Sequence, residues 1–217
     1  MRKIIYFTFL IGLIWSWREG TLPSFGGSQV NAFDSFGNPI IEVYTAPQCG
    51  SYCDDVVKAL NKRKTSFSLR VINPQNSDSE FYDVWKKHSG GALPLILSGN
   101  DKVTNTSTSQ LVSLLGKNFG TKYLTHYEKR YFKKHFYADG SPKIVMYGAD
   151  WCPYCKKLRE EFVAAEQDFL EIDVDKSHEK DLITHTLQIG GYPTTWVGYT
   201  RVNGGVLSAV EKVLNSY

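Results

Sequence analysis

Two cysteines late in the chain, Cys152 and Cys155, are separated by two residues in the sequence Trp-Cys-Pro-Tyr-Cys. The largely apolar residues 143–148 precede them and a helical pattern follows, so we expect a strand, a short turn and a helix that begins at the cysteines. A thiolate at a helix N-terminus meets unpaired N–H groups and the positive end of the helix dipole, which lower its pKa. The spacing therefore predicts thiol–disulfide exchange, with Cys152 as the exposed, low-pKa thiol and Cys155 as the buried one.

The residues beside these cysteines favour the same chemistry. Lys156, Lys157 and Arg159 add positive charge, whereas Asp150 opposes them. The alternatives for two such cysteines are two buried small residues and half of a zinc site, which would need two further ligands. The only other cysteines of the chain form a close pair of their own, and no histidine stands at ligand spacing from a cysteine or another histidine. We therefore expect redox chemistry at this pair and no metal site.

Residues 151–155 resemble the active-site sequence of the thioredoxin superfamily, and the likeness extends over residues 143–217. Pro-Tyr between the cysteines is the glutaredoxin dipeptide, and a tryptophan before them is a thioredoxin feature. The sequence Gly-Tyr-Pro-Thr at 191–194 supplies a second hallmark, a proline that the family keeps cis beside the cysteines. The resemblance implies that Cys152 attacks a disulfide of a partner and that Cys155 resolves the mixed disulfide.

The resemblance also implies a substrate-binding surface around the cysteines. Backbone groups of Tyr192, next to a cis Pro193, would hold the substrate chain in an extended form, as they do in the superfamily. Trp151 and Tyr154 would flank the entrance. The superfamily includes oxidants and reductants, so the resemblance leaves the direction of electron flow open.

Two positions depart from the patterns of these relatives. Many thioredoxins have a buried carboxylate, used in proton transfer, six residues before the first cysteine; this chain has Met146 there, as glutaredoxins would. Glutaredoxins hold glutathione with Gly-Gly and a nearby Asp at the start of the last helix. Here Gly204 and Gly205 are followed by Val-Leu-Ser, without the Asp. Glutathione as a co-substrate is therefore in doubt, and we expect no bound cofactor.

The first half of the chain repeats the order of the second. Strand, cysteine pair, helix, strand, helix, proline, hairpin and helix occur over residues 39–117 and again over 143–217, and Pro94 matches Pro193. In the first copy we expect strands at 40–45, 66–72 and 95–97, and helices at 54–63, 78–88 and 111–115. The predicted fold class is α/β, with two tandem three-layer domains of the thioredoxin or glutaredoxin type joined by an amphipathic helix.

The cysteines of the first copy, Cys49 and Cys53, are four residues apart, one more than the family pattern. Positions i and i+4 share a helix face, and their Cα atoms can fall within the roughly 4.4–6.8 Å that a disulfide tolerates. Asp54 and Asp55 follow, where the second copy has basic residues. The pair is either a modified second redox centre or a structural disulfide of a degenerate domain. We favour a disulfide that forms but turns over poorly.

Residues 118–142 connect the two copies. Aromatic and leucine side chains recur there at helical intervals, lysines and an arginine fill the remaining positions, and Asp-Gly-Ser-Pro ends the stretch. The pattern predicts a basic amphipathic connector helix. We expect its aromatic face to pack on the second domain, with its charges in solvent. Contact with anionic lipid headgroups is the weaker alternative.

The N-terminus has the form of an export signal. Residues 2 and 3 are basic. Residues 4–17 form an apolar, uncharged run that is as long as the core of a signal peptide. Without a good cleavage site nearby, residues 1–20 are either a signal peptide or an uncleaved signal anchor in the membrane; a buried N-terminal element is the remaining alternative. Residues 21–38, rich in Gly, Ser, Pro and Asn, are predicted to be a linker.

These features predict an exported thiol–disulfide oxidoreductase whose partners are protein thiols and disulfides, in the bacterial periplasm or on the periplasmic face of the inner membrane. A non-catalytic tandem module that binds peptides or proteins, and a carrier of metal or iron–sulfur clusters, are the alternatives. The formal net charge of +3 comes without a basic stripe interleaved with aromatics, which argues against a nucleic-acid partner.

Overall fold

The computed structural model describes residues 29–217. The predicted signal peptide or anchor, residues 1–20, lies outside the described residues, and so does the first part of the predicted linker. The rest of that linker is not a free connection, contrary to expectation, because Val30 and Ala32 are buried and Ala32 pairs with Gly99. In the described part of the chain, no helix combines the length and the apolar character that a bilayer-spanning helix needs.

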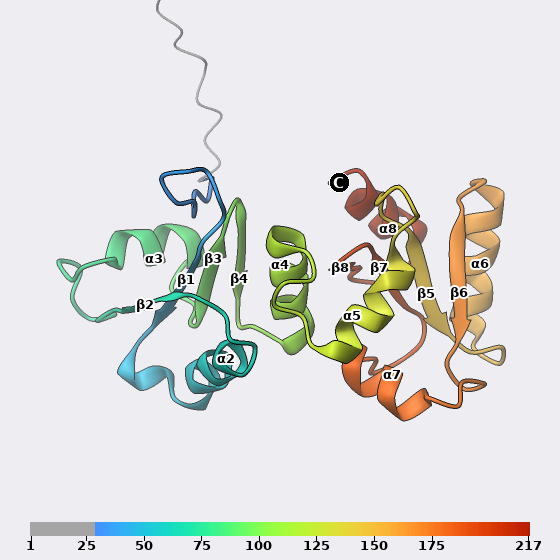
Figure 1. Ribbon diagram of the computed structural model, residues 1–217, viewed down its shortest axis with the longest axis horizontal. Coiled ribbons are helices and arrows are strands. Elements are labelled where there is room, and N and C mark those ends of the chain that lie inside the picture. Colours follow the sequence, from blue (N-terminus) through green and yellow to red (C-terminus); the bar gives the residue numbers. More distant parts are fainter. Residues whose placement is uncertain (1–28) are drawn as a thin grey trace, which may run out of the picture.

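The first domain is built on a four-stranded sheet of order β2-β1-β3-β4 (Figure 1). Its strands are β1 (Ile41–Thr45), β2 (Ser68–Val71), β3 (Leu95–Ser98) and β4 (Asp101–Thr104). Its helices are η1 (Pro47–Cys49), α2 (Ser51–Lys62), α3 (Tyr82–Ser89) and α4 (Thr108–Phe119). The sheet pairs β1 with β2 in parallel and with β3 antiparallel.

The second domain repeats this arrangement with the sheet order β6-β5-β7-β8. Its strands are β5 (Ile144–Gly148), β6 (Phe169–Asp173), β7 (Thr194–Val197) and β8 (Thr200–Arg201). Its helices are α6 (Pro153–Ala164), α7 (Lys180–Leu187) and α8 (Leu207–Leu214). The strands β1 and β5, each followed by a cysteine pair, point to the same side of the molecule in Figure 1.

Each sheet is covered on both faces, which gives the predicted three layers. In the first domain, Val43 packs with residues of α2 and α4 on one face, and Tyr44 packs with Trp85 of α3 on the other. In the second, Met146 packs with residues of α6 and α8, and Val145 faces the side of α7. Adjacent strand residues thus face opposite layers, as the period of two in a strand requires.

The register shows how closely the copies match. Tyr44, five residues before Cys49, pairs with Leu95, the residue after Pro94. In the same way Tyr147, five residues before Cys152, pairs with Thr194, the residue after Pro193. The peptide bonds Leu93–Pro94 and Tyr192–Pro193 are both cis, as the resemblance implied.

The connector differs from the single helix predicted over residues 118–142. Helix α4 runs on to Phe119 and ends at Gly120, whose φ is 59°. A new short helix, α5 (His126–Phe132), begins at Thr125, whose side chain and that of Glu128 form a capping box, and the 3-10 turn η2 (Lys133–His135) follows it. The glycine and the capping box break the helix because each satisfies the backbone groups of a helix end.

The predicted helix α3 was also too long at its start. The sequence predicts this helix over 78–88, but it begins at Tyr82 because Phe81 adopts the left-handed conformation with φ 65°. Val84 is exposed, and Trp85 carries the packing of this helix.

The aromatic residues of the connector pack on the second domain, as predicted. The ring centroids of Phe132 and Trp196 lie 5.2 Å apart. His135 is fully buried: its Nδ1 contacts the Gly198 carbonyl oxygen at 2.9 Å and its Nε2 the Tyr147 hydroxyl at 2.9 Å. Because a carbonyl oxygen only accepts, Nδ1 is the donor and Nε2 accepts from the tyrosine. Burial lowers the pKa of His135 to about 4, so the ring is neutral near pH 7.

The two domains share one hydrophobic core. The cluster that holds α2 and α4 of the first domain continues into α5, α7 and the facing side of β5 and β7. Arg63, just after α2, forms two hydrogen bonds of 2.5 and 2.6 Å with the carboxylate of Glu128 in α5, and both side chains are almost fully buried. Burial opposes the ionisation of Glu128, but the hydrogen bonds and charge of Arg63 outweigh it and lower the pKa of that carboxyl.

Helix α4 also touches the second domain directly. A Cβ atom at Gly116 would lie 2.5 Å from the ring of Tyr199, so only glycine permits this approach of α4 to the β7–β8 turn. With the shared core and the buried ion pair, this contact fixes how the domains face each other.

Candidate redox site

Cys152 and Cys155 are joined in a disulfide at the start of α6, with their Cα atoms 5.2 Å apart. Cys152 is the N-cap residue of the helix, and its sulfur accepts a hydrogen bond of 3.1 Å from the N–H of Cys155. Pro153 occupies the first helical turn. A thiolate at Cys152 would therefore keep an N–H donor and the positive end of the helix dipole, the arrangement that lowers a cysteine pKa.

The prediction that Cys152 is exposed is wrong for this disulfide form. Cys152 is 2% exposed and Cys155 is fully buried. The sulfur of Cys152 is bonded to Cys155 and packed in an apolar cluster that Tyr192 partly covers. Trp151 and Tyr154, predicted to flank the entrance, are largely exposed on either side of Cys152 in the chain.

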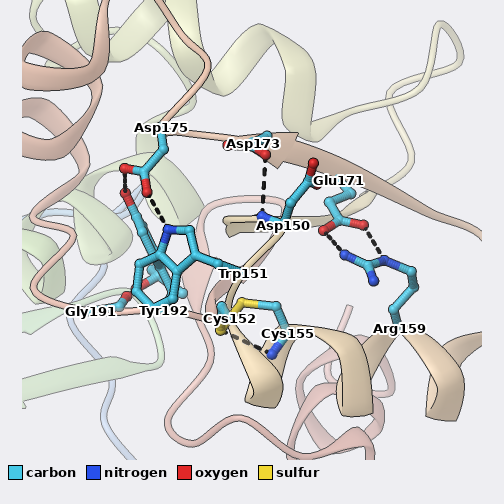
Figure 2. Close-up of a disulfide and its surroundings, with 11 residues drawn as sticks. Asp150, Trp151, Cys152, Cys155, Arg159, Glu171, Asp173, Asp175, Gly191 and Tyr192 are labelled. Atoms are coloured by element: carbon cyan, nitrogen blue, oxygen red, sulfur yellow. Dashed lines mark hydrogen bonds and ion pairs between the residues drawn. A yellow bond between two sulfur atoms is a disulfide. The ribbon is translucent and has the colours of Figure 1, made fainter.

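One carboxylate holds Trp151 and Tyr192 in place (Figure 2). Asp175 accepts hydrogen bonds from the indole N–H of Trp151 at 2.7 Å and from the hydroxyl of Tyr192 at 3.2 Å. The two rings have centroids 6.1 Å apart. Lys180 forms an ion pair with Asp175 at 2.7 Å, and its hydrogen bond, followed by that of Trp151, lowers the pKa of this carboxyl. Sequence reasoning gave Asp175 no role in the site, because the contacts join segments more than 15 residues apart.

The charges around the disulfide are more balanced than the sequence suggested. Asp150 is paired with Lys176, whose hydrogen bond and charge lower the pKa of that carboxyl. The positive charge of Lys176 therefore offsets the repulsion between Asp150 and a thiolate at Cys152. Arg159, expected to add positive charge, is bound to Glu171. The other two cations predicted beside the cysteines, Lys156 and Lys157, are both exposed, and Lys157 lies 3.9 Å from the carboxylate of Glu161.

Glu171 brings a carboxylate to the buried side of the disulfide. It pairs in register with Met146, the position where thioredoxins have their carboxylate, but it comes from the neighbouring strand β6. A Cβ atom at Gly148 would lie 2.9 Å from the sulfur of Cys155 and 3.8 Å from Oε1 of Glu171. Because Gly148 has no side chain, the sulfur of Cys155 and the carboxylate of Glu171 both lie close to its backbone, on the same side of the sheet.

Arg159 fixes the carboxylate of Glu171 in this position with two hydrogen bonds of 2.6 and 2.5 Å (Figure 2). Sequence reasoning missed this residue. The available signal was a lone glutamate inside the strand Phe-Leu-Glu-Ile-Asp, because a charged residue in a strand beside apolar ones needs a partner.

Cys49 and Cys53 are also bonded, with Cα atoms 5.8 Å apart, inside the range predicted from their spacing. They do not share one helix face, however, as the sequence had suggested. Cys49 ends the 3-10 turn η1, and Gly50, with φ 63°, is the N-cap of α2, which contains Cys53. The first cysteine therefore lies before the helix and not at its cap.

At the start of α8, the region where glutaredoxins bind glutathione, a carboxylate of the chain itself accepts a backbone N–H. Its N-cap residue Val206 offers no side-chain cap, as the sequence predicted. The N–H of Leu207 instead donates to the carboxylate of Glu161 in α6 at 3.1 Å. Among the described residues, no group of three or more metal-ligating side chains comes together.

Comparison with known proteins identifies the second domain. Residues 133–214 match the family model of a thioredoxin-like domain. No curated protein matches the chain. Among solved structures, the holo form of glutaredoxin C1 from Populus tremula x tremuloides shows 14% identity over 42% of this chain and 89% of its own, with a TM-score of 0.31. A wheat glutaredoxin shows 16% identity over 36% of this chain and 74% of its own, with a TM-score of 0.28.

At these scores the two glutaredoxins add nothing to the family match. The α/β sheet order and the cis proline beside the cysteines agree with that match. Residues 133–214 therefore form a thioredoxin-like domain, which places this part of the chain in the thioredoxin superfamily.

Proposed function

We propose that the protein is a thiol–disulfide oxidoreductase that exchanges disulfides with protein partners through Cys152 and Cys155. The observation that carries the proposal is the Cys152 sulfur at the N-cap of α6, where it accepts the N–H of Cys155 beside the cis Tyr192–Pro193 bond. Such a sulfur is stabilised as a thiolate, and the thiolate is the nucleophile of disulfide exchange.

In the reducing direction, the Cys152 thiolate attacks one sulfur of a partner disulfide, and the other partner sulfur leaves as a thiolate that takes up a proton. Cys155 then loses its proton and attacks the Cys152 sulfur of the mixed disulfide. This step releases the second partner thiol and forms the Cys152–Cys155 disulfide seen here. Two electrons pass to the partner, and the reverse sequence oxidises a partner dithiol.

We assign the proton transfer at Cys155 to Glu171. Cys155 is fully buried, and its sulfur and the Glu171 carboxylate both lie close to Gly148. The two groups form no hydrogen bond in the disulfide form, so we propose that a water molecule relays the proton. Arg159 holds the carboxylate of Glu171 in a fixed orientation.

Export remains part of the proposal and rests on the sequence of the first 20 residues. A reporter fused after residue 40 tests it: export of the reporter supports an extracytoplasmic site of action, and a reporter that stays in the cytoplasm contradicts it. We also propose that glutathione is not the main co-substrate, because Glu161 already caps the start of α8.

Reduction of insulin by the full chain tests the activity. Wild-type protein with dithiothreitol should precipitate the insulin B chain, and Cys152→Ser should reduce this rate to the background of dithiothreitol alone. Ser89→Cys, which adds a thiol away from the site, is a control for non-specific thiol reactivity. Equal insulin reduction by wild type and Cys152→Ser would contradict the proposal and favour a non-catalytic binding module.

A further inference from the structure

A cleft of about 770 Å³ lies between the two domains, within the size range of ligand-binding sites. One wall is β4 of the first domain, the other is β8 with the loop that follows it, and residues of α4 lie between them. Figure 1 shows α4 in this central position, between β4 and β8. Both strands are the last of their sheets, so among residues 29–217 each has one edge that pairs with no other strand.

The cleft reaches the disulfide site. Its lining includes Pro193 and Thr194, which directly follow Tyr192. Tyr192 packs on the cluster that contains both cysteines. At the same end, Gly205 lies against the proline ring, because a Cβ atom there would be 3.2 Å from Cγ of Pro193. A chain bound along the cleft would therefore continue past Pro193 towards Cys152.

The edges of the cleft suit an extended polypeptide. An unpaired strand edge offers N–H and C=O groups that can bind an added strand, and the side chains of that strand then decide specificity. Serine and threonine residues of α4 and β4 add further hydrogen-bonding groups to the lining.

The charge of the cleft indicates which polypeptide fits. Arg201 is partly buried, which lowers its pKa, and it donates to the carbonyl oxygen of Gln188 at 2.8 Å. Lys102 donates to the carbonyl oxygen of His88 at 2.8 Å. Neither cation has a carboxylate partner among the described residues, whereas Asp101, the acid in the lining, is already paired with Lys117 at 2.7 Å. The side chain of Lys102 lies on the face of the sheet that α3 covers, like that of Leu97, its partner in register. Arg201 is therefore the cation that the cleft presents without a carboxylate partner in the described part of the chain.

The cleft is preformed and not a loose gap between domains. Gly116 of α4 holds the helix against Tyr199, and the core and the Arg63–Glu128 ion pair join the domains on the side of α2 and α5. Because the walls are fixed relative to each other, a bound segment does not have to bring them together, and binding costs less ordering.

We propose that this cleft binds an extended, acidic segment of the protein whose disulfide is exchanged at Cys152, with the first domain supplying one of its two walls. The proposal rests on the proposed function and adds the chemistry of the partner to it. In this arrangement the bound backbone lies beside an edge strand, and an aspartate or glutamate side chain faces Arg201.

Two peptides with the same intramolecular disulfide test the proposal, one with acidic and one with neutral residues on the side that would enter the cleft. The full chain should reduce the acidic peptide with the higher kcat/KM. Arg201→Gln should lower kcat/KM for the acidic peptide about 10-fold, as expected for a lost charged contact of partly buried groups, and leave the neutral peptide almost unchanged. Lys129→Gln, on the exposed surface of α5, is the matched control.

A second variant, Ser113→Trp, fills the cleft without changing its charge. It should slow the reduction of both peptides but leave the reduction of a small disulfide, dithiobis(nitrobenzoic acid), at the wild-type rate, which also shows that the variant is folded. Unchanged peptide rates in both variants would overturn the proposal.

Binding is measured separately, so that a failure of the cleft can be distinguished from a failure of the activity. The anisotropy of a fluorescent acidic peptide without cysteine should rise on addition of wild-type protein. The Kd from this titration should be about 10-fold higher for Arg201→Gln. Absence of turnover with the small disulfide would contradict the proposed function alone. Equal binding by wild type and Arg201→Gln would contradict the acidic cleft alone.

Discussion

The two cysteine pairs of this chain follow equivalent strands, yet their sulfurs meet different surroundings. Cys152 is itself the N-cap of its helix and accepts a backbone N–H. In the first domain the extra residue, Gly50, takes the N-cap position, and Cys49 is displaced into the 3-10 turn before it. A single inserted residue thus moves the first sulfur away from the helix end that would stabilise its thiolate.

The charged neighbours differ as well. Asp54 and Asp55 lie in the first turns of α2, whereas Lys156 and Lys157 occupy the corresponding part of α6. Beside the second pair, Trp151 and Tyr192 are held by Asp175, and both Glu171 and the buried sulfur of Cys155 lie close to Gly148. The comparison suggests that the same fold serves for disulfide exchange in one copy, and for stability and partner binding in the other.

Insertion of a glycine between Cys152 and Pro153 would give the second site the spacing of the first. Cys152 would lose the N-cap position, and the disulfide would no longer be opposite Tyr192. We expect the insulin reduction rate to fall at least about 100-fold, because both thiolate stabilisation and positioning are lost. Iodoacetamide labelling of the reduced protein against pH should show a higher Cys152 pKa than in wild type. A glycine inserted after Gly140, in an exposed turn, is the control, and an unchanged Cys152 pKa would argue against the N-cap explanation.

Glu171→Gln tests the carboxylate that the first site lacks in this position. The attack of Cys155 on a mixed disulfide should slow roughly 10-fold, below the effect of a base in direct contact, because the proton passes through water. The alkylation rate of Cys152 should stay close to that of wild type. Glu160→Gln, an exposed neighbour on α6, should change neither rate. Rapid-quench measurement of mixed-disulfide decay separates the two steps, and equal decay in both variants would remove Glu171 from the mechanism.

Asp175→Ala should have a smaller effect, since it releases Trp151 and Tyr192 without touching either sulfur. We expect KM for insulin to rise about 3- to 5-fold, because both rings lose a hydrogen bond that orients them, with kcat little changed. Trp fluorescence should also change as the indole loses its acceptor. Asp181→Ala, on the exposed side of α7, serves as the control. A fall in kcat with an unchanged KM would indicate that these rings act on the chemical step.

Cys49→Ser/Cys53→Ser should have the smallest effect on activity. Turnover should remain that of wild type, while the free energy of unfolding falls by about 2 kcal/mol, the estimate for a loop of this length. Urea denaturation followed by circular dichroism measures the loss. A stability equal to that of wild type, combined with a loss of turnover, would mean that the first pair is a redox centre.

The order of elements and the second cysteine site could be predicted because they depend on local sequence. The strand before Cys152, the proline in the first helical turn and the Tyr192–Pro193 sequence each specify their own backbone. The break in the connector was also visible in principle, at Gly120 and at the capping box of Thr125 and Glu128. It was hidden by the regular spacing of aromatic residues across the break.

Contacts between distant segments could not be predicted in this way. Glu171 comes to the same side of the sheet as Cys155 because of the register between β5 and β6, and both lie close to Gly148. Asp175 joins Trp151 to Tyr192 across three segments. The inter-domain cleft depends on the close approach of Gly116 to Tyr199, which no local pattern indicates.

The most direct test of the division between the two sites is a trapping experiment with matched variants. Cys155→Ser and Cys53→Ser each remove the second cysteine of one pair, and each is incubated as full chain with the same oxidised protein substrate. Mass spectrometry of non-reduced tryptic peptides then locates the mixed disulfides. We expect Cys155→Ser to accumulate adducts on Cys152, and Cys53→Ser to show almost none on Cys49. Adducts on Cys49 at a comparable yield would contradict the division and indicate that the two domains act as a relay.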